Sequence, residues 1–161
     1  MIISSPAAFV RKAKLEDIPE LASRLRHEDV REIRSTTPAE QSLESVLAYN
    51  VGASSTAFAI VDLQSDAVIA LFGAAPAGDG TGSVWMHGSD LIKTRRITFL
   101  KHSRRAVELL HAEYPILRNW ADTRNQVHLD WLRYAGFRFL GTSTSISNDG
   151  TPFVEFFRKG R

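Results

Sequence analysis

One segment, residues 116–137, constrains the fold of this chain more than any other: it reads ILRNWADTRNQVHLDWLRYAGF. Its first residues alternate apolar and polar side chains, which predicts a half-buried strand, and Pro115 prevents a preceding helix from continuing. Asn125 suits the N-cap of a helix, because its side-chain oxygen can accept a hydrogen bond from an unpaired first-turn amide. Gly136 ends that helix, since glycine adopts the left-handed conformation most easily. The segment therefore predicts a strand, a capped helix and a further strand that starts near Phe137.

The rest of the chain alternates strand-like and helix-like patterns between clear turn signals. Strands are expected at residues 9–13, 57–63, 67–75 and 83–88, and on both sides of a final turn at 147–151. Helices are expected at 15–25, in a second helical region over 28–50 with Pro38 at a helix start, and from about Thr94 to Tyr114. The inward face of that last helix would include Ile97, Leu100, Val107 and Leu110. The order β, α, α, β, β, β, α, β, α, β, β predicts an α/β fold with a mixed, mostly antiparallel sheet flanked by helices.

Length and composition favour an ordinary globular protein. With 161 residues and no linker or internal repeat, we expect a single domain over 1–161. The absence of cysteine excludes disulfides and thiolate metal sites, and the five histidines show no metal-ligand spacing, so we expect no metal. No apolar run approaches the roughly 20 residues that cross a bilayer, and the N-terminus lacks the pattern of a signal peptide. These features favour the cytoplasm and no membrane partner.

The helix from Asn125 to Gly136, with Phe137 after it, resembles the last conserved segment of the GCN5-related N-acetyltransferases, the GNAT superfamily. In that family the Asn at the mouth of the helix lies near the arm of coenzyme A. The N-terminal FVRKAKLEDIPELASRL is similar to the family's first strand and helix, and TPFVEFFRK to its last strand. The likeness covers nearly the whole chain. It implies a GNAT-like fold, acetyl-CoA as co-substrate and no metal.

A narrower resemblance is to small GNAT-like proteins of short-tailed bacteriophages, a group that includes internal-virion proteins. It is carried by VWMHGSDLIKTRRITFLKHSRRAV and by YPILRNWADTRN. It implies a location in the cytoplasm of the infected host cell or in the virion.

The resemblance also implies a pyrophosphate site at the start of the long helix near residue 94, where free amides and the helix dipole favour an anion. The family pattern there is Gln/Arg-x-x-Gly-x-Gly/Ala, but this chain has SDLIKTRRITF and no glycine between Gly88 and Gly136. We therefore expect side chains to contribute: Lys93, Arg95 and Arg96 to the CoA phosphates, with Thr94 as N-cap. The alternative is a solvated basic turn whose charge Asp90 partly offsets.

The strand over 83–88 is the expected donor side, because its amides can pair with the pantetheine arm. Trp85 and Met86 represent it among the predicted cofactor-binding residues, together with Asn125. A plain N-cap explains Asn125 equally well.

The acceptor amine needs a base, and His87 and Glu28 are the predicted catalytic residues, with Asp29 and Glu32 as further candidates. A lone histidine in a strand is more often structural, so that alternative stays open for His87. Many active relatives place a tyrosine acid seven residues after the Asn, where this chain has Leu132. Tyr134 lies about 200° further around the helix and cannot replace it.

Two functions follow from these observations. The first is an acyl-CoA-dependent N-acyltransferase that moves acetyl from acetyl-CoA to an amine of a protein or small molecule by direct attack. The second is a catalytically inactive GNAT-fold phage protein that acts in virion assembly or binds a host protein, since the glycine loop and the tyrosine are missing.

The net charge of +2 is too small to indicate a nucleic-acid partner, and we expect none, although Lys101, Arg104 and Arg105 form a basic helix face. Family members often dimerise, so a homodimer stays open.

Overall fold

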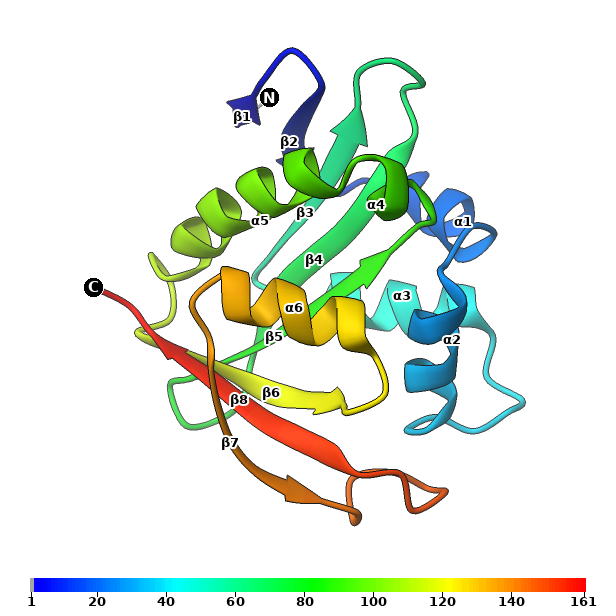
Figure 1. Cartoon of the computed structure of the whole chain (residues 1–161), viewed down its shortest axis with the longest axis vertical. Helices are drawn as coiled ribbons and strands as arrows, with labels where there is room; N and C mark the ends of the chain where they lie inside the picture. The colour runs from blue at the N-terminus through cyan, green and yellow to red at the C-terminus, as the bar shows by residue number, and fades with distance from the viewer. Residues whose placement is uncertain (1) are drawn as a thin grey trace.

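The computed structural model describes residues 2–161, which form one eight-stranded sheet flanked by helices (Figure 1). The strand order is β1-β2-β3-β4-β5-β6-β8-β7, and every neighbouring pair is antiparallel except β5 and β6, which are parallel. The strands are β1 (Ile3–Ser4), β2 (Ala8–Lys12), β3 (Thr56–Asp62), β4 (Val68–Pro76), β5 (Gly82–Gly88), β6 (Ile116–Asp122), β7 (Arg138–Ser143) and β8 (Phe153–Lys159). The predicted mixed, mostly antiparallel sheet is confirmed.

Helices cover both faces of this sheet. They are α1 (Asp17–Ala22), α2 (His27–Arg34), α3 (Leu43–Ala53), α4 (Leu91–Thr94), α5 (Arg96–Leu110) and α6 (Gln126–Tyr134). Helices α5 and α6 lie on the near face in Figure 1, and α1 and α3 lie on the far face. Strand β4 is buried on both faces, which explains its unbroken apolar run VIALFGAA. No helix within residues 2–161 is long and apolar enough to span a membrane.

Two hydrophobic cores result. The larger one lies between the sheet and α5 and α6, and includes Phe72, Phe99 and Trp131. The smaller one lies under α1 and α3, with Leu21 and Leu47 packed against the other face of β3 and β4. The sheet therefore separates two layers, and a break between its strands connects them.

That break lies between β5 and β6. Their register pairs are confined to Gly82↔Leu117 and Ser83↔Arg118, at the start of both strands, within residues 2–161. Beyond Ser83 the two strands diverge, and β6 instead pairs along its full length with β8. The centre of the sheet thus opens toward Gly88 and Asp122.

Several sequence predictions need correction. The strand β1 was not predicted, because two residues carry no measurable periodicity. Pro38 does not start a helix: it lies in the connection between α2 and α3, where its carbonyl accepts from the Gln41 amide. Helix α3 begins after its N-cap Ser42, continues through Gly52 and ends at Ala53, with Ser54 as its C-cap.

The long helix differs as well. It is divided at Arg95 into α4 and α5, and Thr94 is not an N-cap, because its hydroxyl donates to the Leu91 carbonyl. Of the predicted inward residues, Val107 and Leu110 are buried and Leu100 packs against the core, but Ile97 is 70% exposed. Phe99, His102 and Ala106 complete the inward face.

Candidate functional site

The open edge of β5 is the structural centre of the site. The Val84 carbonyl accepts a hydrogen bond from Asn119 Nδ2 at 2.8 Å, and the Gly88 amide donates to Asp29 Oδ2 at 2.8 Å. Alternate residues of a strand present their backbone groups at the same edge, so Met86 also faces β6. Met86 has no register partner in β6 among the residues described. The backbone amide and carbonyl of Met86 are therefore available for pairing, between the occupied positions of Val84 and Gly88.

Residues at the start of α2, including its N-cap Arg26, close the wide end of the gap between β5 and β6. The backbone amide of Arg26 donates to the Gly88 carbonyl at 3.0 Å. Its fully buried guanidinium donates to Asp29 Oδ1 at 2.8 Å and to Asn125 Oδ1 at 3.1 Å. Asn125 Nδ2 in turn donates to Asp29 and Glu32 at 2.9 and 2.8 Å. We call Arg26, Asp29 and Asn125 the mouth network, because together they join the end of β5 to the start of α6.

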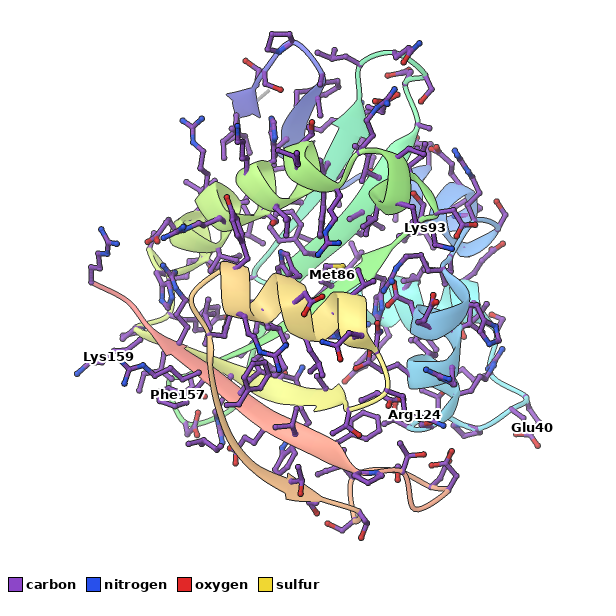
Figure 2. All side chains as sticks on the ribbon, viewed as in Figure 1. Glu40, Met86, Lys93, Arg124, Phe157 and Lys159 are labelled. Atoms are coloured by element: carbon purple, nitrogen blue, oxygen red, sulfur yellow. The ribbon has the colours of Figure 1, made fainter. Side chains whose placement is uncertain are left out.

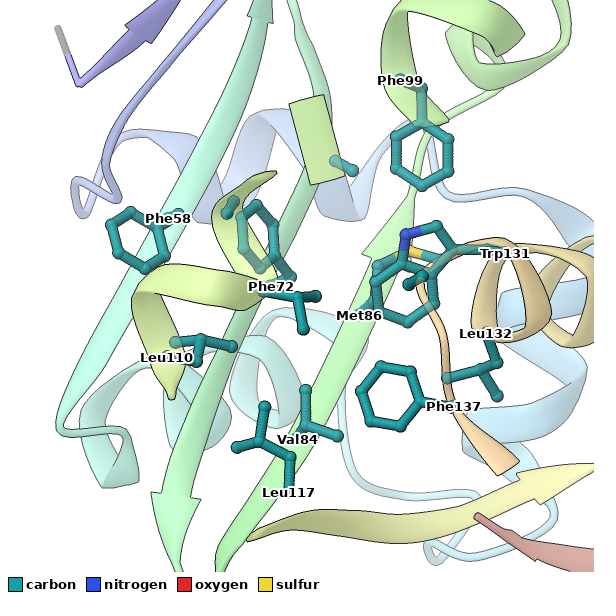
Figure 3. Packing of buried hydrophobic residues seen from close by; sticks show 14 of the residues in the cluster. Phe58, Phe72, Val84, Met86, Phe99, Leu110, Leu117, Trp131, Leu132 and Phe137 are labelled. Atoms are coloured by element: carbon teal, nitrogen blue, oxygen red, sulfur yellow. The ribbon is translucent and has the colours of Figure 1, made fainter. Parts of the chain in front are cut away.

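Apolar side chains fill the gap between β5 and β6 on the face of the sheet that α5 and α6 cover. Met86 is 2% exposed and packs among Phe99, Trp131 and Phe137, as Figure 3 shows. Trp131 is stacked on the His128 ring, with centroids 5.8 Å apart. Its buried Nε1 has no hydrogen-bond partner in residues 2–161. The face covered by α5 and α6 thus supplies an apolar wall beside Met86, and Trp131 Nε1 is an unpaired hydrogen-bond donor within it.

A cavity of about 470 Å³ opens on the other face. Its walls come from α2, α3 and the loop between them, from β5, β6 and β8, from α6, and from the loop before β8. The residues that line it are Glu32, Ile33, Thr36, Thr37, Gln41, Val46, Tyr49, Asn50, Val84, Trp85, Met86, His87, Asn119, Trp120, His128, Ile146, Phe153 and Phe156. It therefore reaches the free edge of β5 and has the size of a small-molecule site.

His87 lies in this cavity as an uncharged base. Burial lowers the pKa of His87, and the charge of His128 adds to the effect against the attraction of Asp29 and Glu32. Asn50 Nδ2 lies 3.0 Å from His87 Nε2. Because an amide nitrogen can only donate, Nε2 is the accepting nitrogen and Nδ1 carries the proton. At neutral pH the ring can take up a proton from a bound group that displaces Asn50.

Glu32 and His128 form a buried ion pair beside it. Burial alone would raise the pKa of Glu32, but the charge of His128 and hydrogen bonds from His128, the Asp122 amide and Asn125 lower it to about 2. Burial likewise opposes the charge on His128, and Glu32 outweighs it and raises the pKa of His128. The distance from His128 Nδ1 to Glu32 Oε2 is 3.0 Å. Their contact therefore favours the carboxylate form of Glu32 and the imidazolium form of His128.

The structure brings several predicted site residues together and leaves others apart. His87, Trp85, Met86 and Glu32 all line the cavity, with Trp85 and Met86 on opposite faces of β5. Glu28 lies outside it, where its Oε2 is 3.8 Å from Arg26 Nη1 and hydrogen bonding to its own amide lowers its pKa. Asn125 is the N-cap of α6, as predicted, and accepts from the His128 amide at 3.3 Å.

The three basic residues of the turn point in different directions. Lys93, labelled in Figure 2, is exposed, and its Nζ lies 3.7 Å from Asp90 Oδ1. Arg95 is directed away from the gap, because its Nε donates to Asp62 at 2.8 Å and its Nη2 to Gln64. Arg96 lies beside α6, with Nη2 3.7 Å from Asp130. The first intrahelical bond of α5 runs from Phe99 to Arg95, so the three preceding amides have no acceptor within the helix.

Leu132 is completely buried in the larger core, at the position where a tyrosine acid was sought. Tyr134 lies on the outer side of α6, under the Arg104 guanidinium at 5.5 Å from the ring centroid. Neither residue reaches the cavity. Among residues 2–161, no group of three histidine and acidic side chains could hold a metal ion.

Sequence reasoning missed Arg26 and the pairing of Glu32 with His128. Arg26 precedes α2 in an ordinary polar stretch, and nothing local signals its complete burial. Its partner Asn125 is 99 residues away, and Glu32 and His128 are 96 residues apart. Only the fold brings these residues together.

The sequence matches no family model and no curated protein. Its structure is similar to a GCN5-related N-acetyltransferase from Kribbella flavida, with a TM-score of 0.73, 17% identity and coverage of 97% of this chain and 99% of that one. It is similar to the ribosomal-protein-S5-alanine acetyltransferase from Vibrio fischeri, with a TM-score of 0.70, 12% identity and 98% and 96% coverage. It is also similar to AAC(6')-Ib in complex with ribostamycin and coenzyme A, with a TM-score of 0.67, 19% identity and 95% and 93% coverage. The chain therefore has the fold of the GCN5-related N-acetyltransferases.

Proposed function

We propose that this protein is an acyl-CoA-dependent N-acyltransferase, with acetyl-CoA as the donor and an amine as the acceptor. The observation that carries the proposal is the free edge of β5 at Met86, which meets a cavity containing the uncharged base His87. Structural likeness to acetyltransferases, one of them with bound coenzyme A, supports the same reading.

The reaction needs an uncharged amine and a fixed thioester. The Met86 amide would hold the thioester oxygen at the strand edge, and His87 would accept a proton from the ammonium of the acceptor. The amine nitrogen then attacks the thioester carbon, a C–N bond forms and the C–S bond breaks. The CoA thiolate leaves and takes up a proton, so no covalent intermediate on the protein is needed.

For the donor phosphates, the proposed contacts are Arg96, whose guanidinium lies beside Asp130 of α6, and the first-turn amides of α5, which have no acceptor within the helix. For Trp85, Asn125, Lys93 and Thr94, cofactor binding stays a prediction from the sequence. Arg95 is not among the proposed contacts, because Asp62 and Gln64 hold its guanidinium.

The test is calorimetry with acetyl-CoA, followed by detection of free CoA thiol in the presence of a panel of amines. Arg96→Ala is expected to weaken acetyl-CoA binding by about 3- to 10-fold, through the loss of one charged phosphate contact. Arg95→Ala is the matched control and is expected to leave affinity unchanged, since Asp62 and Gln64 already hold that guanidinium. Absence of acetyl-CoA binding by the unaltered protein would refute the proposal.

A second candidate function is a GNAT-fold protein without turnover, which acts in phage virion assembly or binds a host protein. The mouth network favours it, because both backbone groups of Gly88 are already occupied and Arg26 is fully buried across the gap. Thiol release with any amine would exclude this candidate.

A further inference from the structure

The cavity beside His87 distinguishes between classes of amine by its charge. Glu32 is the one carboxylate among its lining residues. The two oxygens of Glu32 already accept from His128 Nδ1, from the Asp122 amide at 2.8 Å and from Asn125 Nδ2 at 2.8 Å. His128 Nδ1 lies 3.0 Å from Glu32 Oε2, so the imidazolium form of His128 is already the counter-charge of this carboxylate. An acceptor with several ammonium groups would therefore find no free counter-charge, and burying an unpaired charge is costly.

The walls of the cavity match an apolar body. Trp85, Trp120, Phe153 and Phe156 contribute aromatic surface from three strands. The helical side adds aliphatic surface from Ile33, which is 4% exposed, and from Val46. Aromatic rings favour stacked or edge-on contact with another ring. A phenyl group buried against such walls would gain affinity from the apolar surface that it removes from water.

One side chain of the cavity wall is open to solvent. Tyr49, on α3, is 72% exposed and lines the same cavity as His87 on β5. Its neighbour Asn50 lies against the His87 ring, with Nδ2 3.0 Å from Nε2. A ligand that places its nitrogen at His87 would therefore have the aromatic walls and the Tyr49 ring in the same cavity as the rest of its body.

From these contacts we infer that the acceptor is a monoamine on an aromatic body, and that polyamines and aminoglycosides are poor ligands of this cavity. The inference rests on the proposed function for the identity of the cavity as the acceptor site. It differs from what the names of two neighbours imply for those proteins, a spermidine N-acetyltransferase and a protein complexed with ribostamycin.

The experiment compares three amines, by calorimetry without acyl-CoA and by thiol release with acetyl-CoA. The first is 2-phenylethylamine, the second is ethanolamine, which has the same charge and no ring, and the third is spermidine. We expect 2-phenylethylamine to bind at least about tenfold more tightly than the other two, as burial of a ring surface predicts. Tighter binding of spermidine or ethanolamine, or no binding of any of the three, would overturn the inference.

Two tyrosine variants locate the binding site. Tyr49→Ala is expected to weaken 2-phenylethylamine binding about threefold or more, and its exposure makes misfolding a minor concern. Tyr134→Ala is the matched control, since Tyr134 is partly exposed on α6 and lies outside the cavity. Equal effects of the two variants would place the ligand elsewhere and reject the inference. Selective aryl-amine binding without thiol release would support the inference while the proposed acyl transfer fails.

Discussion

At the scale of single residues, the chemistry of the candidate site depends on what surrounds His87. Its place in a strand was predicted from the sequence, because the run SVWMHG over 83–88 follows a clear turn signal. Its lowered pKa and its contact with Asn50 were not predicted, since the burial comes from the fold and the partner lies on α3, 37 residues earlier in the chain. The sequence offered His87 as a candidate base, and only the fold shows what surrounds it.

The role of His87 as a base predicts a defined pH profile. Because burial lowers its pKa below the ordinary 6.5, the base form is present above that lowered value and is lost as the pH falls through it. We expect kcat/KM with an aryl amine to fall on the acid side with a midpoint below pH 6.5, and His87→Gln to reduce kcat about 100-fold and remove that acid limb.

The control for this profile is His27→Gln, which changes an exposed histidine outside the cavity. It should keep both kcat and the acid limb. An acid limb that persists in His87→Gln would assign the proton transfer to another group.

At the scale of elements, periodicity predicted the strands and helices but not their ends. In the predicted inward face of α5 only Ile97 was wrong, and it lies in the first turn after the division at Arg95, which SDLIKTRRITF does not signal. The predicted helical region ended at residue 50, yet α3 continues through Gly52 to Ala53. Glycine inside an element is ambiguous in sequence, and its surroundings decide its effect.

Two glycines provide a matched test of that statement. A Cβ at Gly73 in β4 would lie 2.7 Å from the Thr56 carbonyl oxygen and 3.1 Å from Ala57 Cα, both backbone atoms of β3. A Cβ at Gly52 in α3 would meet nothing within 4 Å. We expect Gly73→Ala to lower the free energy of unfolding by about 2 kcal/mol, and Gly52→Ala to raise it by about 0.5 kcal/mol.

Urea denaturation of both variants against the unaltered protein measures the difference. A Gly73→Ala protein as stable as the Gly52→Ala protein would show that β3 and β4 can separate at no cost.

At the scale of the whole molecule, the ion pair of Glu32 and His128 joins α2 to α6 across the open end of the sheet. The lowered pKa of Glu32 contributes stability above 4.5, which is lost as the pH falls toward about 2. The raised pKa of His128 contributes stability below 6.5, which is lost as the pH rises through its folded value. The pair therefore stabilises the fold most between about pH 4.5 and 6.5.

We expect Glu32→Gln to lower the free energy of unfolding by about 3 kcal/mol near pH 5.5, because a fall in pKa from 4.5 to about 2 corresponds to that amount. The loss should shrink above the raised pKa of His128, where the imidazole is neutral in both proteins. Urea melts near pH 5.5 and pH 9 test this. Asp79→Asn, which removes an exposed ion pair with Arg118, should have a much smaller effect, and a pH-independent loss in Glu32→Gln would contradict the assignment.

The mouth network has a kinetic consequence for any donor that pairs with β5 beyond Met86. Arg26 must first release the Gly88 carbonyl and Asn125, so association becomes a two-step event whose first step is independent of ligand concentration. The observed binding rate would then level off at high donor concentration instead of climbing in proportion to it. The same barrier would slow dissociation of the bound donor, because the donor can leave only after the same rearrangement of Arg26.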